Sequence, residues 1–288
     1  MIRKAIIPAA GFGTRFLPAT KSQPKEMLPI VDTPVIQYVV EEAVQAGITD
    51  LLMIIGKGKR SIEEHFDRSF QLETQLASQG KVAELQAMRR ISELADIHFV
   101  WQKEMRGLGD AVYCARYHIH NEPFVVLLGD TVIDAARSAA APMVELFDEL
   151  QQPVILLEQV EPRKVSSYGV IDGQEIRPGV YRIRDFVEKP RPEQAPSDLV
   201  IAGRYLLTPD IFDFIRRTPP SKDGEIQLTE ALKSLAKSRP VYGLKLDGKR
   251  CDIGNKEGFI RTNIEFALKR SDMADELREF IKQLARET

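Results

Sequence analysis

The stretch "AIIPAAGFGTRFLPATKSQPKEMLP", residues 5–29, joins a short apolar run to a loop rich in glycine and positive charge. A short apolar run that ends in a turn signal predicts a buried strand. Gly11 and Gly13 allow the chain to turn sharply and leave backbone N–H groups accessible, as anion-binding loops require. Three cations flank or follow these glycines: Arg15, Lys21 and Lys25. The stretch therefore predicts a strand that ends in a polyphosphate-binding loop.

The glycine spacing distinguishes this loop from two common phosphate-binding motifs. Phe16 stands where the dinucleotide fingerprint needs its third glycine, which disfavours a nucleotide-dependent oxidoreductase. No Gly-Lys-Ser/Thr sequence follows, so the loop is not a Walker A motif. Considered by itself, the loop could still be an ordinary connection between a strand and a helix, with its cations in solvent.

Apolar runs alternate with amphipathic segments through the first half of the chain. Strands are predicted over residues 3–9, 50–56, 97–102 and 123–130. Helices are predicted between them, one over 34–47 with Gly47 at its end and a long one over 72–95. Strands that alternate with helices imply an α/β fold with a mostly parallel sheet flanked by helices, and ligands gather at the carboxyl ends of such strands.

Strand-like runs are more closely spaced after Pro153, with glycine and proline between them. These runs cover residues 154–160, 168–172, 180–190 and 199–209, and they predict hairpins or a mixed sheet. Helical patterns return at 227–237, 256–269 and 272–286. Because no repeat or low-complexity linker separates the two halves, we expect one compact unit.

Length, charge and cysteine content exclude several classes of protein. The 288 residues carry a formal net charge of -2, which argues against a nucleic-acid-binding or membrane-surface protein. No span of about 18 apolar residues occurs, and Pro8 and Gly11 interrupt the first apolar run too early for a signal peptide. Cys114 and Cys251 are too few for a disulfide framework, so we expect a reducing, cytoplasmic location.

Two segments of the opening loop resemble the signature of the sugar-1-phosphate nucleotidylyltransferases. "GFGTRFLP" fits G-x-G-T-R-x-x-P, and "PKEMLP" fits P-K-x-x-x-P. Within that family, "TKSQPKEMLP" is most similar to the bacterial-type uridylyltransferases, and the likeness extends to "CDIGNKEGF" at 251–259. The resemblance implies that UTP and glucose 1-phosphate are converted to UDP-glucose and diphosphate, with Mg²⁺ as cofactor. It also implies a homodimer or homotetramer.

The same resemblance implies a fold and a role for each part of the chain. The fold is the nucleotide-diphospho-sugar transferase fold, a Rossmann-like mixed sheet with a smaller β-rich sugar-binding part. We expect residues 1–288 to form a single nucleotidyltransferase domain. Its nucleotide-binding half would cover 1–150, its sugar-phosphate-binding half 151–270 and its C-terminal helix 271–288. Apolar residues at helical spacing in that last segment could cover the core or bind a second subunit.

The residue types present suit the implied reaction. A sugar phosphate has a second pKa of about 6, so near neutral pH it can attack the α-phosphorus of UTP without a general base. The difficulty is electrostatic, because like charges ~4 Å apart repel by about 4 kcal/mol at an effective dielectric constant of about 20. Fixed cations and a divalent metal ion reduce that repulsion. The sequence supplies cations and carboxylates, with no evident Ser/His/Asp or Cys/His set.

The resemblance assigns site residues in four overlapping groups. The expected catalytic cations are Arg15, Lys25 and Lys189. The nucleotide site is expected to contain Ala10, Gly11, Gly13, Arg15, Lys25, Gln102 and Gly107. The sugar-phosphate site is expected to contain Gly169, Glu188, Lys189 and Gly203. The expected metal ligands are Asp130 and Asp252.

Several of these residues also have a simpler structural interpretation. Asp130 could be the N-cap of the next helix, and Asp252 could serve only a turn. Gly169 and Gly203 could be turn or packing glycines. Alternation along a strand places neighbouring side chains on opposite faces. The pair at 188–189 can therefore reach one ligand only at a strand end or bulge, and the proline at 190 indicates such an end.

Two departures from the family pattern lie near the expected nucleotide site. Asp110 stands where many relatives have histidine, and "LGD" at 128–130 replaces the more common "LPD". Neither departure removes a needed group. Gln102 offers a donor and an acceptor side by side, which suits the imide edge of either uracil or thymine. Both bases therefore remain open.

Two other functions remain open as well: a thymidylyltransferase that uses dTTP and the same sugar phosphate, and a non-catalytic regulatory homologue that binds nucleotide sugars. The cations and carboxylates argue against the second, because a binding-only protein has little use for groups that stabilise a leaving diphosphate. Outside the site, His118 and His120 form a His-x-His pattern. This pair follows a helix and precedes a strand, so we interpret it as surface packing and not as a metal pair.

Overall fold

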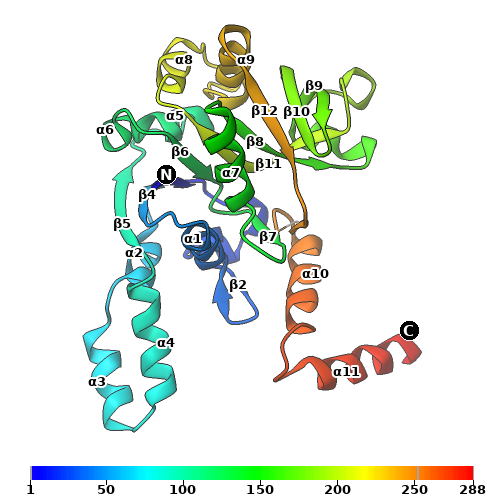
Figure 1. Ribbon diagram of the computed structural model, residues 1–288. Coiled ribbons are helices and arrows are strands. Elements are labelled where there is room, and N and C mark those ends of the chain that lie inside the picture. The colour runs from blue at the N-terminus through cyan, green and yellow to red at the C-terminus, as the bar shows by residue number, and fades with distance from the viewer. Residues whose placement is uncertain (1, 252, 288) are drawn as a thin grey trace.

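The computed structural model describes residues 2–251 and 253–287, and its centre is a nine-stranded sheet (Figure 1). The strand order is β5-β4-β1-β6-β11-β8-β12-β10-β9. The strands are β1 (Lys4–Ala9), β4 (Asp50–Ile55), β5 (Asp96–Trp101), β6 (Phe124–Leu127), β8 (Val154–Gln159), β9 (Gly169–Arg177), β10 (Val180–Glu188), β11 (Leu199–Leu207) and β12 (Val241–Lys245). Two short pairs lie outside this sheet: β2 (Pro29–Ile30) with β3 (Thr33–Pro34), and β7 (Val132–Asp134) with β13 (Lys249–Cys251).

The strands from the first half of the chain form a parallel arrangement. β1 lies between β4 and β6, and β5 continues the parallel set at the edge. Both faces of this part are covered: Ile6 packs into the apolar cluster on one face and Ile7 into the cluster on the other. Burial on both faces explains why β1, β4 and β6 are nearly continuous apolar runs, whereas the edge strand β5 is partly exposed. The four strands predicted here are confirmed.

The strands from the second half make the sheet mixed. β11 is antiparallel to both β6 and β8, β10 is antiparallel to both β9 and β12, and β8 and β12 are parallel. The hairpin of β9 and β10 forms the smaller β-rich part at the far edge (Figure 1). The closely spaced strands predicted after Pro153 are thus confirmed, and they belong to the same sheet as β1.

Helices cover both faces of the sheet. The helices on one face are α1 (Val35–Gln45), α2 (Arg60–Phe66) and α7 (Ala141–Leu150). The helices on the other are α5 (Gly107–Cys114), α8 (Ile211–Arg217) and α9 (Leu228–Ser238), and the short α6 (Arg116–Ile119) follows α5. The prediction of a helix that ends before Gly47 is confirmed, because this glycine follows α1 with φ 79°. Such a backbone favours glycine.

The single long helix predicted over 72–95 is wrong. The structure has two helices there, α3 (Phe70–Ser78) and α4 (Val82–Ser92), with Gly80 at φ 68° between them. Arg89 of α4 lies 2.9 Å from the carboxylate of Glu73 on α3 and so joins the two helices, and Arg68, just before α3, lies 2.7 Å from the same carboxylate. The apolar periodicity continued through the break, and only the left-handed glycine marked the turn. The helices project from the body as an arm (Figure 1).

The C-terminal part extends from the opposite side of the molecule as α10 (Lys256–Ala267) and α11 (Ala274–Glu287) (Figure 1). The predicted helix at 272–286 is confirmed. Only Ala274 of α11 is buried, so α11 does not cover the core of this chain. Among the described residues, no helix combines the length and the apolar character that a bilayer crossing requires.

Candidate active site

Four cavities lie along the carboxyl ends of the central strands and share lining residues. Asp130 lines three of the cavities. Lys189 lines one of these three and also the fourth cavity, so the four cavities form one continuous cleft. One of these cavities has a volume of about 600 Å³ and is lined by Arg15, Asp130 and Lys189 together. Residues more than a hundred positions apart in sequence thus lie at one cavity, because the sheet brings the ends of β1, β6 and β10 to a common edge.

The opening loop leaves β1 after Ala9 and lines three cavities of the cleft. It continues into three short 3-10 helices, η1 (Thr14–Phe16), η2 (Ala19–Lys21) and η3 (Lys25–Met27), and the first α-helix begins only at Val35. The groups that this loop could offer an anion are therefore backbone N–H groups and side-chain cations, since no α-helix begins directly after it. Gly13 has φ 66°, and a Cβ there would lie 3.0 Å from the Cβ of Lys25. Both features require glycine.

A buried ion pair beneath the loop holds its shape. The Lys59 amine lies 2.7 Å from the Glu26 carboxylate and donates to the Gly11 carbonyl, also at 2.7 Å. Burial raises the pKa of Glu26, and the charges of Lys59 and Lys25 oppose that rise. Sequence reasoning missed Lys59, whose signal was one more cation in "GKGKR" after β4. A buried pair with a further backbone bond specifies one loop conformation.

Lys25 and Asp130 form an ion pair in the middle of the cleft. Burial lowers the pKa of the Lys25 amine, but the carboxylates of Asp130 and Glu26 outweigh burial and raise that pKa. Burial raises the pKa of Asp130, but the charge and the hydrogen bond of Lys25, together with a backbone hydrogen bond and the charge of Arg204, outweigh burial and hold that pKa below its usual range. Both groups are therefore charged near neutral pH. The N-cap interpretation of Asp130 is wrong, because the strand β7 follows it and not a helix.

The second predicted metal ligand, Asp252, lies outside the described residues. The fit of a metal ion is therefore judged on Asp130 alone. Its carboxylate is ionised and borders three of the four cavities, next to the loop and its cations. Mg²⁺ takes one or two carboxylate oxygens and fills its remaining positions with water and phosphate oxygens. Asp130 fits that requirement.

The predicted nucleoside-binding residues gather at another cavity of the cleft, which Ala10, Gly11, Gln102 and Gly107 all line. The amide nitrogen of Gln102 donates to Asp110 at 2.9 Å and to the Gly107 carbonyl at 3.2 Å. Both amide protons are used in this way, so the polar atom that Gln102 offers to a base is the acceptor Oε1.

The carboxylate that orients Gln102 was not predicted to act at the site. Asp110 accepts a second bond from Arg106 at 3.0 Å, which gives a chain from Arg106 through Asp110 to Gln102. Sequence reasoning noted Asp110 only as a departure from the family pattern. Its role depends on α5 lying against the end of β5, which no local pattern indicates.

The predicted sugar-phosphate residues line the fourth cavity: Gly169, Glu188, Lys189 and Gly203. β10 ends at Glu188, and Lys189 follows with φ 44°, so strand alternation stops between the two side chains. The expected strand end is confirmed, and it explains how neighbouring residues face one cavity. Thr229 donates to Glu188 at 2.6 Å, and the Lys189 amine lies 3.3 Å from the other carboxylate oxygen.

The two glycines of this cavity have tight surroundings. Gly203 has φ 76° and lies where the register of β11 against β8 shifts. A Cβ there would come within 3.3 Å of the side chains of Leu128 and Thr131, and a Cβ on Gly169 would come within 3.1 Å of Ile201. Packing therefore accounts for both glycines, and both also border the cavity.

A buried ion pair supports the segment that follows Asp130. Arg204 is fully buried and donates to both oxygens of Glu42, at 2.9 and 2.6 Å. The same guanidinium donates to the Thr131 carbonyl at 2.8 Å. Sequence reasoning missed this pair; its only signals were one arginine within the apolar strand "LVIAGRYLL" and one glutamate on α1. The pair therefore connects α1 and β11 to the segment at Thr131, directly after Asp130.

The fold and this cleft define a nucleotide-transfer enzyme of one known class. Residues 4–268 match the family model described as nucleotidyl transferase. The chain therefore belongs to the nucleotidyl transferase family, and the recognition made from the opening loop is confirmed.

Individual relatives are similar over nearly the whole chain. A UTP–glucose-1-phosphate uridylyltransferase from Staphylococcus saprophyticus is 50% identical over 283 residues, which cover 98% of each chain. A UTP-bound UGPase from Acinetobacter baumannii superimposes with a TM-score of 0.92 at 36% identity, over 99% of this chain and 100% of that one. A UDP-glucose pyrophosphorylase complexed with UDP-glucose gives a TM-score of 0.86 at 44% identity, over 94% and 100% of the two chains.

Proposed function

We propose that this chain transfers the uridylyl group of UTP to α-D-glucose 1-phosphate and so produces UDP-glucose and diphosphate. The observation that carries this proposal is the single cavity lined by Arg15, Asp130 and Lys189. Groups for the leaving diphosphate, for a metal ion and for the acceptor phosphate then lie within one cleft. The choice of substrates is supported by a relative with 50% sequence identity that is named for this reaction.

The proposed step is a direct displacement. An oxygen of the sugar phosphate forms a bond to the α-phosphorus of UTP, and the bond from that phosphorus to the bridging oxygen of the β-phosphate breaks. The diphosphate leaves with the electron pair. Near neutral pH the attacking phosphate is already mostly a dianion, because its second pKa is about 6. No residue is needed as a general base, and the protein acts through position and charge.

The cations of the opening loop would bind the triphosphate. Arg15 lines two of the three cavities that Asp130 borders. The Lys25 amine lies against the loop backbone, 3.5 Å from the position that a Cβ on Gly11 would occupy. In the proposed complex these two cations neutralise the β- and γ-phosphates and the diphosphate that forms from them. Fixed charges of this kind need no reorganisation during the reaction, which is why they stabilise a transition state.

Asp130 would hold Mg²⁺, together with Asp252 by family resemblance. A divalent ion at this position supplies charge neutralisation and polarises the phosphate oxygens. Lys25 forms an ion pair with the same carboxylate, so it would compete with a metal ion for Asp130. Binding of the metal ion would therefore require the Lys25 amine to leave Asp130. A triphosphate in the cleft offers Lys25 an alternative partner.

The nucleoside would bind between the loop and Gln102. The acceptor Oε1 of Gln102 suits the N3–H of a uracil ring, and the loop and the Gly107 segment offer backbone N–H groups for its carbonyl oxygens. Thymine has the same imide edge. The choice of UTP over dTTP therefore rests on the uridylyltransferase relatives and not on this contact.

Lys189→Ala is expected to raise the KM for glucose 1-phosphate by about 10–100-fold, the effect of losing a hydrogen bond to a charged group. The KM for UTP and kcat should change little, because Lys189 borders the acceptor cavity and not the nucleoside cavity. Initial rates with each substrate varied in turn measure this split. Arg191→Ala, an exposed cation two residues away, is the matched control. An unchanged KM for glucose 1-phosphate would remove Lys189 from the acceptor site.

The wider organisation follows the same proposal. We assign the nucleotide to residues 1–150, the sugar phosphate to 151–270 and a C-terminal helix to 271–288, all within one domain. A homodimer or homotetramer stays a prediction, supported by apolar side chains that the described chain exposes on α10 and α11, such as Ile260 and Phe280. A cytoplasmic location also stays a prediction; the two free cysteines are compatible with it.

A panel of substrates tests the function directly. Purified protein with Mg²⁺ is given UTP or dTTP with glucose, galactose or mannose 1-phosphate, and released diphosphate is measured with and without EDTA. We expect the highest kcat/KM for UTP with glucose 1-phosphate and loss of activity in EDTA. A preference for dTTP would make the protein a thymidylyltransferase. Absence of diphosphate release from every pair would favour a non-catalytic homologue.

A further inference from the structure

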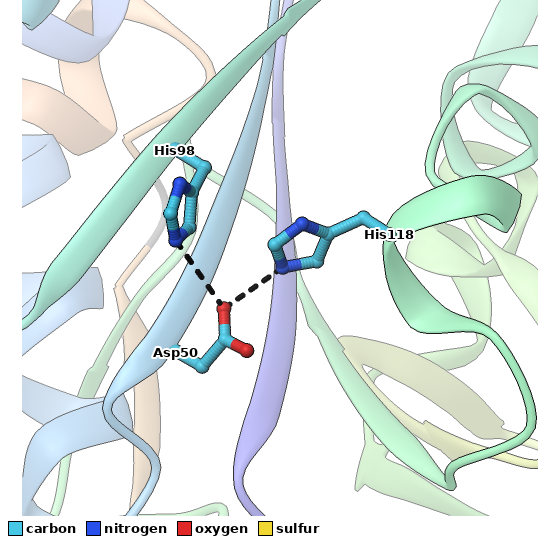
Figure 2. A group of neighbouring side chains, drawn as sticks. All are labelled: Asp50, His98 and His118. Atoms are coloured by element: carbon cyan, nitrogen blue, oxygen red, sulfur yellow. Dashed lines mark hydrogen bonds and ion pairs between the residues drawn. The ribbon is translucent and has the colours of Figure 1, made fainter.

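Two histidines and one aspartate meet near the amino ends of β4 and β5 (Figure 2). Asp50 is the first residue of β4, His98 is the third residue of β5, and His118 lies on α6. Their side chains point toward one another from three separate segments (Figure 2). The active-site residues follow the carboxyl ends of the strands, whereas this cluster lies at the amino end of β4. It is therefore separate from the proposed reaction.

The spacing of the three groups suits one metal ion. Nε2 of His118 lies 2.8 Å from Oδ1 of Asp50, and Nε2 of His98 lies 3.9 Å from the same oxygen. All three ligand atoms lie within 4.8 Å of one another. A tetrahedral zinc ion with bonds of about 2.0–2.1 Å separates its ligand atoms by about 3.3 Å. The two measured distances lie on either side of that value, so small side-chain rotations would bring the atoms to it.

The surroundings permit a positive ion. The nearest lysine on the neighbouring strand, Lys4, is the register partner of Asp50. Its amine donates to the His118 carbonyl at 3.1 Å and lies 2.8 Å from the Glu122 carboxylate, so its charge is compensated locally. The side chain of His98 is 56% exposed and that of His118 is 23% exposed. The side chain of His98 can therefore rotate and solvent can reach the cluster, while the less exposed His118 is held against Asp50.

The type of ligand selects the class of metal. Two imidazole nitrogens with one carboxylate oxygen suit zinc and other transition metals, whereas Mg²⁺ prefers oxygen ligands alone. Three protein ligands leave a fourth tetrahedral position for water. The His-x-His pattern of the sequence contributes only one member, since His118 combines with His98 from β5 and not with His120.

We propose that Asp50, His98 and His118 bind one divalent transition-metal ion, with Zn²⁺ as the best match, at a site distinct from the Mg²⁺-dependent centre. The ion joins the start of β4, the edge strand β5 and the helix α6. Because the three ligands are distant in sequence, an ion that binds them together stabilises the folded chain over the unfolded chain. The proposal concerns stability of this edge and not nucleotidyl transfer.

A cobalt titration tests the site. Metal-free protein without a purification tag is titrated with Co²⁺ in the absence of nucleotide, and the visible absorption of four-coordinate cobalt is followed. We expect one equivalent to bind, Zn²⁺ to displace it, and Zn²⁺ to raise Tm. His98→Ala and His118→Ala should weaken binding by on the order of 100-fold or more, at least as much as the loss of an outer-shell partner. His65→Ala and His120→Ala, which change the other two of the four histidines, should bind as wild type.

The controls separate this site from the active site. Asp130→Asn should retain the cobalt signal, and His98→Ala should retain Mg²⁺-dependent activity, which also reports that it folds. Wild-type protein without a stoichiometric four-coordinate signal would overturn the proposal. Binding unchanged in His98→Ala, or lost in Asp130→Asn, would overturn it as well, since the ion would then lie elsewhere.

Discussion

Arg15→Ala is expected to lower kcat for diphosphate release by on the order of 10²–10³-fold, the usual effect of removing one transition-state charge donor. Arg15 lines two of the three cavities that Asp130 borders, where the leaving diphosphate would form. Negative charge grows on that group as the bond to the α-phosphorus breaks. A guanidinium placed there stabilises the transition state more than the bound substrate, so kcat falls more than KM rises.

Rapid-quench measurement of a single turnover, beside steady-state rates, checks this prediction. Lys21→Ala is the matched control, because it removes an exposed cation from the same loop, and Lys21 lines none of the four cavities of the cleft. We expect the control to keep nearly full turnover. If Arg15→Ala and Lys21→Ala had equal, small effects, the loop would act only through its general charge, and the assigned role of Arg15 would be wrong.

Arg204→Met should lower the free energy of unfolding by about 3–5 kcal/mol, as the loss of one partner from a buried ion pair does. Arg204 is fully buried and satisfies both carboxylate oxygens of Glu42. Its removal leaves a buried charge and leaves the Thr131 carbonyl without its guanidinium donor. Because this segment follows Asp130, activity should fall together with stability.

Urea unfolding followed by circular dichroism measures the effect. The double variant Glu42→Leu with Arg204→Met should recover much of the loss, because no unpaired charge then remains in the core. Arg216→Met, which breaks an exposed pair with Asp213, should cost no more than about 1 kcal/mol. A single variant Arg204→Met as stable as Arg216→Met would show that Glu42 is solvated or protonated without cost, contrary to this account.

Local patterns predicted the strands and several boundaries correctly. Apolar runs located β1, β4 and β6, because strands buried on both faces must be apolar at nearly every position. The edge strand β5 is partly exposed, and its shorter apolar run located it as well. Pro190 marked the end of β10, which lets Glu188 and Lys189 face one cavity. The prediction of one long helix over 72–95 was wrong, because the spacing of apolar residues does not reveal that Gly80 adopts a left-handed backbone conformation and ends the first helix.

By itself, the sequence determined the family, the strand–helix order and the identity of the charged groups, since motif spacing, periodicity and turn residues are properties of neighbours along the chain. Only the tertiary structure decided which of those groups meet. It brought Arg15, Asp130 and Lys189 to one cavity, oriented Gln102 through Asp110, and paired Arg204 with Glu42. It also joined His118 to His98. Such contacts depend on how distant strands and helices pack, and packing has no signature in a single stretch of sequence.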